Sequence, residues 1–429
     1  MAGVVTRVRR IVAALVAAST LVALSACTAP AEPAADYDQV EGELSADLQE
    51  RLDATLDEAI RLSGSSGGIA GVWAPWAGSW TSAAGTVDFS EGSDKATTDT
   101  AFQVPGVTGE LTCAMALRLV DADVIELDQR VDTMVRGLPG LGDITVEQLC
   151  RHTSGLDDYY PPLRRHFVAN PERIWPAGEL IASGMALPHV GEPGAVWKES
   201  RTGMLLLATA LEQYTGRSWA ELAEQYVLDP LNMDGTVLPE QSDTGYAGAL
   251  GGYSAALAAD GSPDCATVVD VSRRSSSIGG AAGGARSTLE EVREFSQAYA
   301  SGALFEEATA RQAWDVVPFG GSAPSWQAQG IGAQQYGPLR GVAGESTGAL
   351  AAVFTDPDSG LTVVLALNNS TGGTTLVREG AFALASVASK AAPADERTQP
   401  LVELPWSYEQ ATQRMTEASP CAEPVASAE

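Results

Sequence analysis

The chain has 429 residues, of which 45% are apolar and 19% are charged. This composition supports a buried core and excludes a disordered chain. Acidic residues outnumber basic residues by 55 to 26, giving a formal net charge of −29, which argues against binding to nucleic acid. With three histidines and no Cys-x-x-Cys sequence, neither a metal site nor another cofactor is predicted.

The first 26 residues have the features of an export signal. Several arginines precede an apolar run at 11–23, which is too short to span a bilayer. The following Leu-Ser-Ala-Cys resembles the lipobox of bacterial lipoproteins, in which the cysteine is lipidated and becomes the N-terminus. We therefore expect a lipoprotein signal peptide at 1–26, lipid attachment at Cys27 and a linker at 27–44. The protein would then be exported and anchored on the extracytoplasmic side of the membrane. An ordinary signal peptide with a chance cysteine is the alternative.

Three segments of the N-terminal third have clear periodicity. Apolar residues at intervals of four from Leu48 to Ile60 predict an amphipathic helix that ends near Gly64. Residues 69–87 are rich in strand-forming residues broken by glycines and predict a hairpin. Residues 111–120 are apolar on nearly all sides and predict a buried helix.

The rest of the domain combines a helical middle with a second group of strands. Residues 145–290 predict mostly helices and polar loops, and residues 349–369 predict two strands joined by an Asp-Pro-Asp-Ser-Gly turn. A last helix is expected at 375–390. Strands at both ends of the chain favour an α+β fold with one antiparallel sheet built from both ends and flanked by helices. A helical subdomain is inserted at about 111–290.

Three blocks, at 100–131, 144–160 and 191–236, resemble the serine β-lactamase and D-alanyl-D-alanine carboxypeptidase family. This family includes the class C β-lactamases, penicillin-binding-protein-like enzymes and related esterases. The resemblance covers roughly residues 45–390. It implies the mixed fold just described, with an active cleft between the sheet and the helical subdomain.

The family's first motif, Ser-x-x-Lys, is not found at the start of the buried helix. The spacing of three places both side chains on one helix face, so that the amine can accept the proton of the serine hydroxyl. Here the serine position holds Gly106 and the lysine position holds Gly109. Thr108 lies about 200° around the helix from Gly106 and therefore faces elsewhere. No serine precedes any lysine of the chain by three residues.

The other two motifs are also altered. Where the family has Tyr-x-Asn, this chain has Glu199, Ser200 and Arg201. Where the family has Lys or His, then Thr or Ser, then Gly, the best match is Val342, Ala343 and Gly344. Acidic residues, Glu110 and Glu345, stand next to the lost lysine and the lost cation. We interpret these acidic residues as neutral substitutions at solvent-exposed positions. The alternative is a cleft adapted to a cationic or amide-bearing ligand. His152 belongs to a block interpreted as a structural turn.

Four cysteines remain after Cys27, and in an oxidising compartment they allow three pairings: Cys113, Cys150, Cys265 and Cys421. In the resembled fold the helices that carry the first two approach each other, which implies a Cys113–Cys150 bridge. A Cys265–Cys421 bridge would then hold the Pro/Ala/Glu-rich tail expected at 391–429, where Trp406 is another candidate docking residue.

These observations favour a lipid-anchored, catalytically inactive member of the family with a binding or scaffolding role in the cell envelope. Its expected partners are the membrane, through the lipid, and a peptide or envelope protein. The alternative is a serine hydrolase, of β-lactamase, carboxypeptidase or esterase type, that uses unorthodox residues near Ser200 or Ser346. A solute-binding lipoprotein is a third hypothesis, which the three blocks disfavour.

Overall fold

The computed structural model describes residues 37–245 and 248–421. The expected signal peptide and Cys27 lie outside the described residues. Within these two ranges, no helix has both the length and the apolar character needed to cross a membrane.

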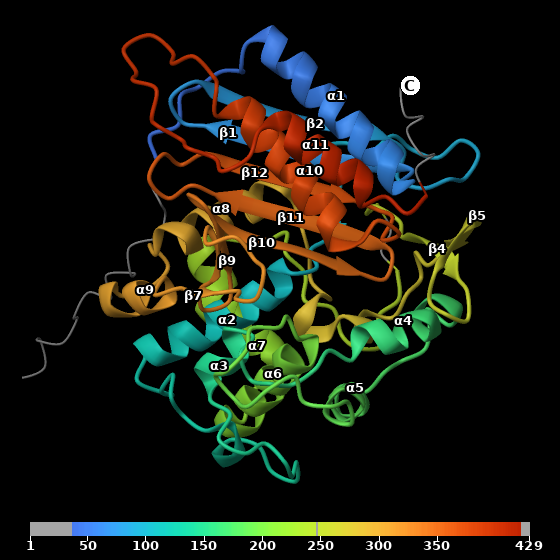
Figure 1. Cartoon of the computed structure of the whole chain (residues 1–429), viewed down its shortest axis with the longest axis vertical. Coiled ribbons are helices and arrows are strands. Elements are labelled where there is room, and N and C mark those ends of the chain that lie inside the picture. The colour runs from blue at the N-terminus through green and yellow to red at the C-terminus, as the bar shows by residue number, and fades with distance from the viewer. Residues whose placement is uncertain (1–36, 246–247, 422–429) are drawn as a thin grey trace, which may run out of the picture. The chain divides into compact units, whose positions relative to one another are not determined.

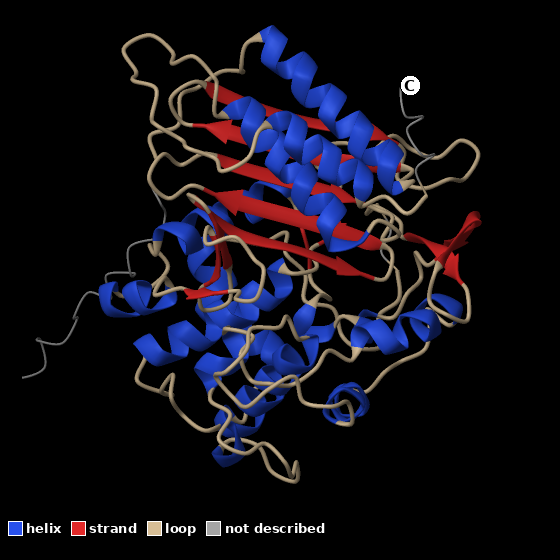
Figure 2. Cartoon of the chain, viewed as in Figure 1, coloured by secondary structure: helices blue, strands red, loops and turns tan. Residues whose placement is uncertain are grey.

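An eight-stranded antiparallel sheet forms the centre of the fold (Figure 1, Figure 2). Its strand order is β2-β1-β12-β11-β10-β9-β8-β7, so strands from the two ends of the domain are neighbours. Gly68 lies opposite Leu367 where β1 pairs with β12. The bounds are β1 Gly67–Ala74, β2 Gly78–Gly85, β7 Val317–Pro318, β8 Gln327–Gln329, β9 Gln334–Tyr336, β10 Leu339–Ser346, β11 Ala349–Thr355 and β12 Thr362–Leu367. This arrangement confirms the α+β fold expected from the sequence.

One face of the sheet is covered by α1 (Ala46–Ser63), α10 (Gly373–Ala388) and α11 (Tyr408–Glu417), as Figure 1 shows. Helix α1 ends at Gly64, whose φ of +68° is the left-handed conformation that glycine adopts most easily at a helix C-terminus. The helices predicted at 48–60 and 375–390 are both present.

Among the described residues, parts of the segments predicted as a linker and a tail pack against the domain. Leu44 is buried, and its N–H donates to the carbonyl of Ser79 at 2.9 Å. In the tail, the Trp406 ring stacks on Phe382 with 4.0 Å between centroids. The tail also forms α11, in which Ala411 and Met415 are buried against the domain. This helix is short and mostly polar, so its brief apolar stripe is easily overlooked in a Pro/Ala/Glu-rich segment.

The other face of the sheet packs against α2 (Val107–Asp121) and α8 (Leu289–Ser301). Helix α2 is buried along nearly its whole length, as its apolar sequence predicted. The remaining helices extend this layer: α3 Val146–Cys150, α4 Tyr160–Ala169, α5 Ala177–Met185, α6 Arg201–Thr215, α7 Trp219–Ala223 and α9 Glu307–Ala313. The stretch expected to be helical, 111–290, also contains the hairpin of β4 (Tyr253–Leu257) and β5 (Pro263–Asp270) and the strand β6 (Arg286–Ser287), which pairs with β3 (Phe102–Gln103).

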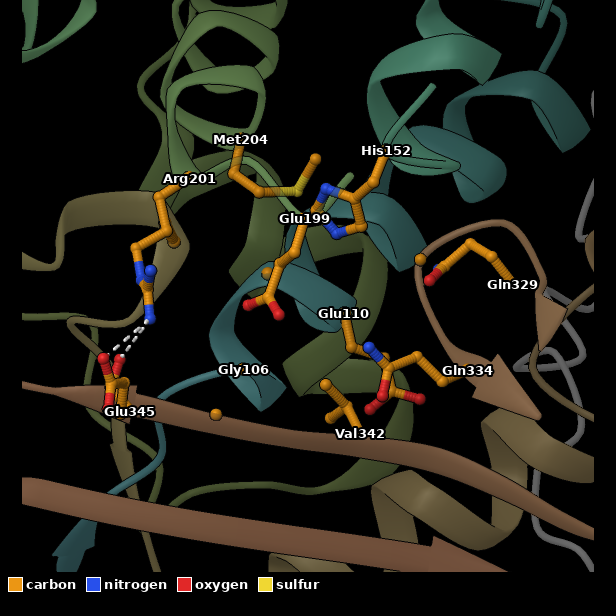
Figure 3. A pocket seen from close by; sticks show the side chains of 14 residues that line it. Gly106, Glu110, His152, Glu199, Arg201, Met204, Gln329, Gln334, Val342 and Glu345 are labelled. Carbon is orange, nitrogen blue, oxygen red and sulfur yellow. Dashed lines mark hydrogen bonds and ion pairs between the residues drawn. The ribbon is translucent and has the colours of Figure 1, made fainter. Parts of the chain in front are cut away.

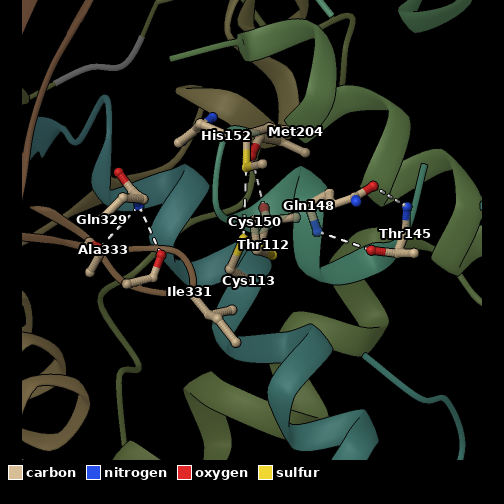
Figure 4. Close-up of a disulfide and its surroundings, with 12 residues drawn as sticks. Thr112, Cys113, Thr145, Gln148, Cys150, His152, Met204, Gln329, Ile331 and Ala333 are labelled. Atoms are coloured by element: carbon tan, nitrogen blue, oxygen red, sulfur yellow. Dashed lines mark hydrogen bonds between the residues drawn. A yellow bond between two sulfur atoms is a disulfide. The ribbon is translucent and has the colours of Figure 1, made fainter. Parts of the chain in front are cut away.

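Two disulfides are present. Cys113 of α2 is bonded to Cys150 at the end of α3, with 5.7 Å between their Cα atoms (Figure 4). Cys265 of β5 is bonded to Cys421 beyond α11, with 5.4 Å between their Cα atoms. Both Cα separations are in the range that a disulfide can bridge. The first fixes α2 against the turn that carries His152, and the second ties the C-terminal segment to the β4–β5 hairpin.

Candidate functional site

The positions that the sequence aligns with the three family motifs meet at one cavity between the sheet and the helical layer (Figure 3). Its volume is ≈ 30 Å³, which leaves room for about two water molecules. We call it the inner cavity. Its lining comprises Gly106, Gly109, Glu110, His152, Glu199, Arg201, Met204, Ala282, Gln329, Gly332, Gln334, Val342, Gly344 and Glu345. Six of the eight motif positions singled out in the sequence belong to this set, and Ser200 and Ala343 do not.

Gly106 is the residue before α2 and has φ +79° and ψ −59°. Residues with a side chain rarely adopt a positive φ. A Cβ atom at this position would lie 3.1 Å from both the backbone nitrogen of Gly344 and Cγ2 of Val342. A Cβ atom on Gly344 would lie 2.6 Å from the nitrogen of Gly106. The backbone at Gly106, just before α2, therefore contacts the backbone of β10 directly.

Gly109 has different surroundings. A Cβ atom built there would have Met204 Cγ at 3.5 Å and the carbonyl of Ala282 at 3.9 Å, which are ordinary contacts. The position would accept a side chain, yet the chain places none there. The three lysines are exposed, and Lys198 pairs with Asp157 at 2.6 Å. None of them lines the inner cavity.

The hydroxyl groups near the cavity are occupied by structural hydrogen bonds. Ser200 precedes α6, and its Oγ accepts from the N–H of Gly203 at 3.3 Å and donates to the carbonyl of Asp157 at 3.2 Å. This is the arrangement of a helix N-cap, which explains a serine at this position. Thr108 Oγ1 donates to the carbonyl of Val104 at 2.8 Å. The buried Ser346 accepts from Gln103 Nε2 at 3.3 Å.

Arg201 is the charged centre of the second motif. Its guanidinium pairs with the buried carboxylate of Asp158 and donates to the backbone carbonyl of Glu345 at 3.1 Å. It also lies over the ring of Tyr160, 4.3 Å from the centroid. Burial lowers the pKa of Arg201, but nearby carboxylates outweigh this and hold it above its usual value. The guanidinium is thus neutralised by protein groups.

His152 lies in the turn after α3 with φ +54°, and it faces the inner cavity. Its Nδ1 accepts a hydrogen bond from the N–H of Ser200 at 3.2 Å. Burial and the charge of Arg201 lower the pKa of His152 to about 4, so the imidazole is neutral at pH 7. Because Nδ1 accepts, the proton of the neutral ring is on Nε2. The interpretation of this block as a structural turn agrees with this bond.

Two acidic side chains line the cavity without hydrogen bonds like those that Arg201 and His152 make to other described residues. Glu110 of α2 is 1% exposed, and burial raises its pKa to about 8. Its Oε2 atom has no hydrogen-bond partner among the described residues. Glu199 is partly buried, and burial raises its pKa against the opposing effect of Arg201. Both side chains are drawn at the cavity in Figure 3, Glu110 from α2 and Glu199 from the segment before α6.

Several lining residues were missed by the motif analysis. Gln329 and Gln334 come from β8 and β9, and Met204 comes from α6. Asp158, the partner of Arg201, is 43 residues away in sequence. No sequence pattern marks any of these residues, because their roles arise from the packing of distant segments.

The antiparallel sheet, the covering helices and the cleft between sheet and helical layer define a penicillin-binding or β-lactamase-like fold. A family model described as Beta-lactamase matches residues 57–388, and the chain belongs to this family of serine hydrolases. The resemblance seen in the three sequence blocks is thereby confirmed.

Similarity to named proteins covers parts of the chain. It is 27% identical over 143 residues to Penicillin-binding protein 4* of Bacillus subtilis, covering 32% of this chain and 31% of that protein. It is 28% identical over 155 residues to a D-aminopeptidase of Gluconobacter oxydans, covering 34% of this chain and 27% of the relative. The matches therefore span about a third of the length of these curated relatives.

Solved structures share the fold more extensively. A D-stereospecific amidohydrolase from Streptomyces sp. superposes with a TM-score of 0.66 at 24% identity, covering 78% of this chain and 98% of the other. A penicillin-binding protein from Bacillus halodurans superposes with a TM-score of 0.60 at 20% identity, covering 74% and 95%. At these identities the similarity shows the fold.

Proposed function

We propose that this protein is a catalytically inactive member of its family that binds a ligand in the former catalytic cleft. The observation that carries the proposal is the pair of glycines at 106 and 109. A nucleophile and a base are both needed for acyl transfer, and glycine supplies neither. In addition, a side chain at position 106 would place its Cβ only 3.1 Å from the backbone nitrogen of Gly344, so β10 would have to give way to admit it.

The alternative, a hydrolase with an unorthodox serine, has less support. Ser200 caps the N-terminus of α6, and Ser346 accepts a hydrogen bond from Gln103. Neither residue lines the inner cavity, so neither hydroxyl is placed to attack a ligand bound there. His152 accepts from a backbone N–H through Nδ1, so that nitrogen is not free to accept a serine proton.

The test is intact-protein mass spectrometry after incubation with a penicillin and, separately, with an activated ester. We expect no covalent adduct, because loss of a nucleophile and its partners can reduce the rate of acylation by about 10⁶. Ser200→Ala and Ser346→Ala are the matched controls. A stoichiometric adduct that disappears in one of these variants would overturn the proposal and identify the acting serine.

We also propose that the protein is anchored to the extracytoplasmic face of the membrane through a lipid on Cys27. The apolar run and the Leu-Ser-Ala-Cys sequence support this. A diacylated cysteine would provide stable anchoring, whereas a single chain would give only reversible attachment.

Cys27→Ser should move the protein from the membrane fraction to the soluble fraction or leave it unprocessed, as measured by fractionation and metabolic lipid labelling. Ser25→Thr, which keeps the cysteine, is not expected to abolish labelling. Unchanged lipid labelling of Cys27→Ser would contradict the anchor.

A further inference from the structure

The charges of the inner cavity are unbalanced. Arg201 is the cationic side chain of its lining, and the protein neutralises it with Asp158 and Glu345. Glu110 and Glu199 remain as acidic groups beyond that pairing. A buried carboxyl group without a partner destabilises a fold, so its presence at a cavity points to a ligand that satisfies it.

Of the two acidic residues, Glu110 is the one whose carboxyl group more clearly needs a partner. It is 1% exposed, Oε2 is unpartnered among the described residues, and it faces the inner cavity. The cavity of ≈ 30 Å³ is too small for a drug-sized ligand but can hold a group the size of one or two water molecules. A protonated primary amine fits this volume, and its three N–H donors match carboxylate oxygens.

A second, larger cavity adjoins the inner one, and we call it the outer cavity. It has a volume of ≈ 450 Å³, and Glu199 and Gln334 line both cavities. Trp197 and Phe319 stack at 3.9 Å between ring centroids on its wall, and Trp197 is fixed by a hydrogen bond to Gln329 at 3.0 Å. The outer cavity therefore offers an aromatic surface next to an acidic recess.

Building on the proposed function, we propose that the inner cavity binds a primary ammonium group, held by Glu110, of a ligand whose apolar or aromatic body lies against Trp197 and Phe319 in the outer cavity. The ligand class is thus a primary amine on an apolar or aromatic body. A carboxylate ligand is disfavoured in the inner cavity, because it would face two acidic groups while Arg201 is already paired.

The groups around Glu110 determine its response to pH. Tyr299 of α8, His152 after α3, Glu199 and Arg201 near α6, and Glu345 of β10 face it or share its cavity. Arg151 is directed away, because it bonds to Glu147 and to the carbonyls of Gln312 and Asp315. In the outer cavity Arg378 is held by Glu379 at 3.1 Å. An ammonium ion bound beside Glu110 favours its ionised form, so binding near pH 7 releases a proton.

Isothermal titration calorimetry of the full chain with three probes of one shape tests the proposal. The probes are 2-phenylethylammonium, the neutral 2-phenylethanol and the anionic 3-phenylpropanoate. We expect the ammonium probe to bind at least tenfold more tightly than the other two. In buffers of different ionisation enthalpy, its binding near pH 7 should release up to one proton.

Glu110→Gln should weaken binding of the ammonium probe at least tenfold and abolish the proton release. Glu50→Gln, an exposed position on α1, removes the same charge and should leave both unchanged. Circular dichroism of each variant establishes that it is folded. Equal binding of 2-phenylethanol, stronger binding of 3-phenylpropanoate, or full affinity in Glu110→Gln would overturn the proposal. These probes carry no hydrolysable bond, so the result is independent of the acylation test.

Discussion

Glu110→Gln should raise the free energy of unfolding by about 4–5 kcal/mol at pH 9 and leave it unchanged at pH 4. Burial raises the pKa of Glu110 from 4.5 to about 8 in the folded protein. Below pH 4.5 the carboxyl group is protonated in both the folded and the unfolded chain, so it does not lower the free energy of unfolding. As the pH rises from 4.5 to 8, the unfolded chain ionises and the folded one does not, so stability is lost over this window.

Urea unfolding of wild type and variant between pH 4 and pH 9 measures this effect. Subtracting the free energy of unfolding of the wild type from that of the variant at each pH removes the contributions of other titrating groups, including His152. We expect the difference to grow through the window and to be constant above pH 8. A difference that does not depend on pH would mean that the buried carboxyl group titrates normally.

Arg201→Met should lower the free energy of unfolding by about 3–5 kcal/mol. The side chains of Arg201 and Asp158 are 13% and 7% exposed, so the pair is shielded from solvent. Removing the guanidinium leaves the carboxylate of Asp158 buried without its counterion and also removes the contact with the Tyr160 ring. The cost of an uncompensated buried charge exceeds the net contribution of the intact pair.

Arg273→Met is the matched control for this prediction. Arg273 pairs with Glu172 at 3.1 Å, but the two side chains are 71% and 56% exposed. Exposed ion pairs typically contribute about 0–1 kcal/mol, so this variant should change stability little. If Arg201→Met and Arg273→Met lowered the free energy of unfolding equally at pH 7, burial would not determine how much each ion pair contributes.

Much of the fold followed from local patterns in the sequence. The hairpin of β1 and β2, the buried helix α2 and the strands β11 and β12 each have a local signal, a continuous apolar run or strand-forming residues bounded by a turn, that a single segment reveals. Helix α11 was missed because its apolar stripe is short: Ala411 and Met415 are buried, Tyr408 is partly buried, and the other residues of the helix are polar. The short strands β8 and β9 are formed by pairing rather than by any propensity of three residues.

The candidate site was predictable where the family resemblance supplies an alignment. That alignment identified Gly106, Gly109 and Arg201, and each of them lines the inner cavity. It indicated that Gly106 has no side chain, but the positive φ depends on the position of β10 and is not readable from the residue name. The burial of Glu110 was also not evident, because the charge was interpreted as solvated.

The close contact of Gly106 with Gly344 also restricts which side chains position 106 can accept. A serine at 106 would have to adopt a φ of +79° and place its Cβ 3.1 Å from backbone and side-chain atoms of β10. A single codon change would therefore produce a strained backbone before it produced a nucleophile. A serine at position 106 would therefore need β10 to give way by a few tenths of an ångström in addition to a strained backbone.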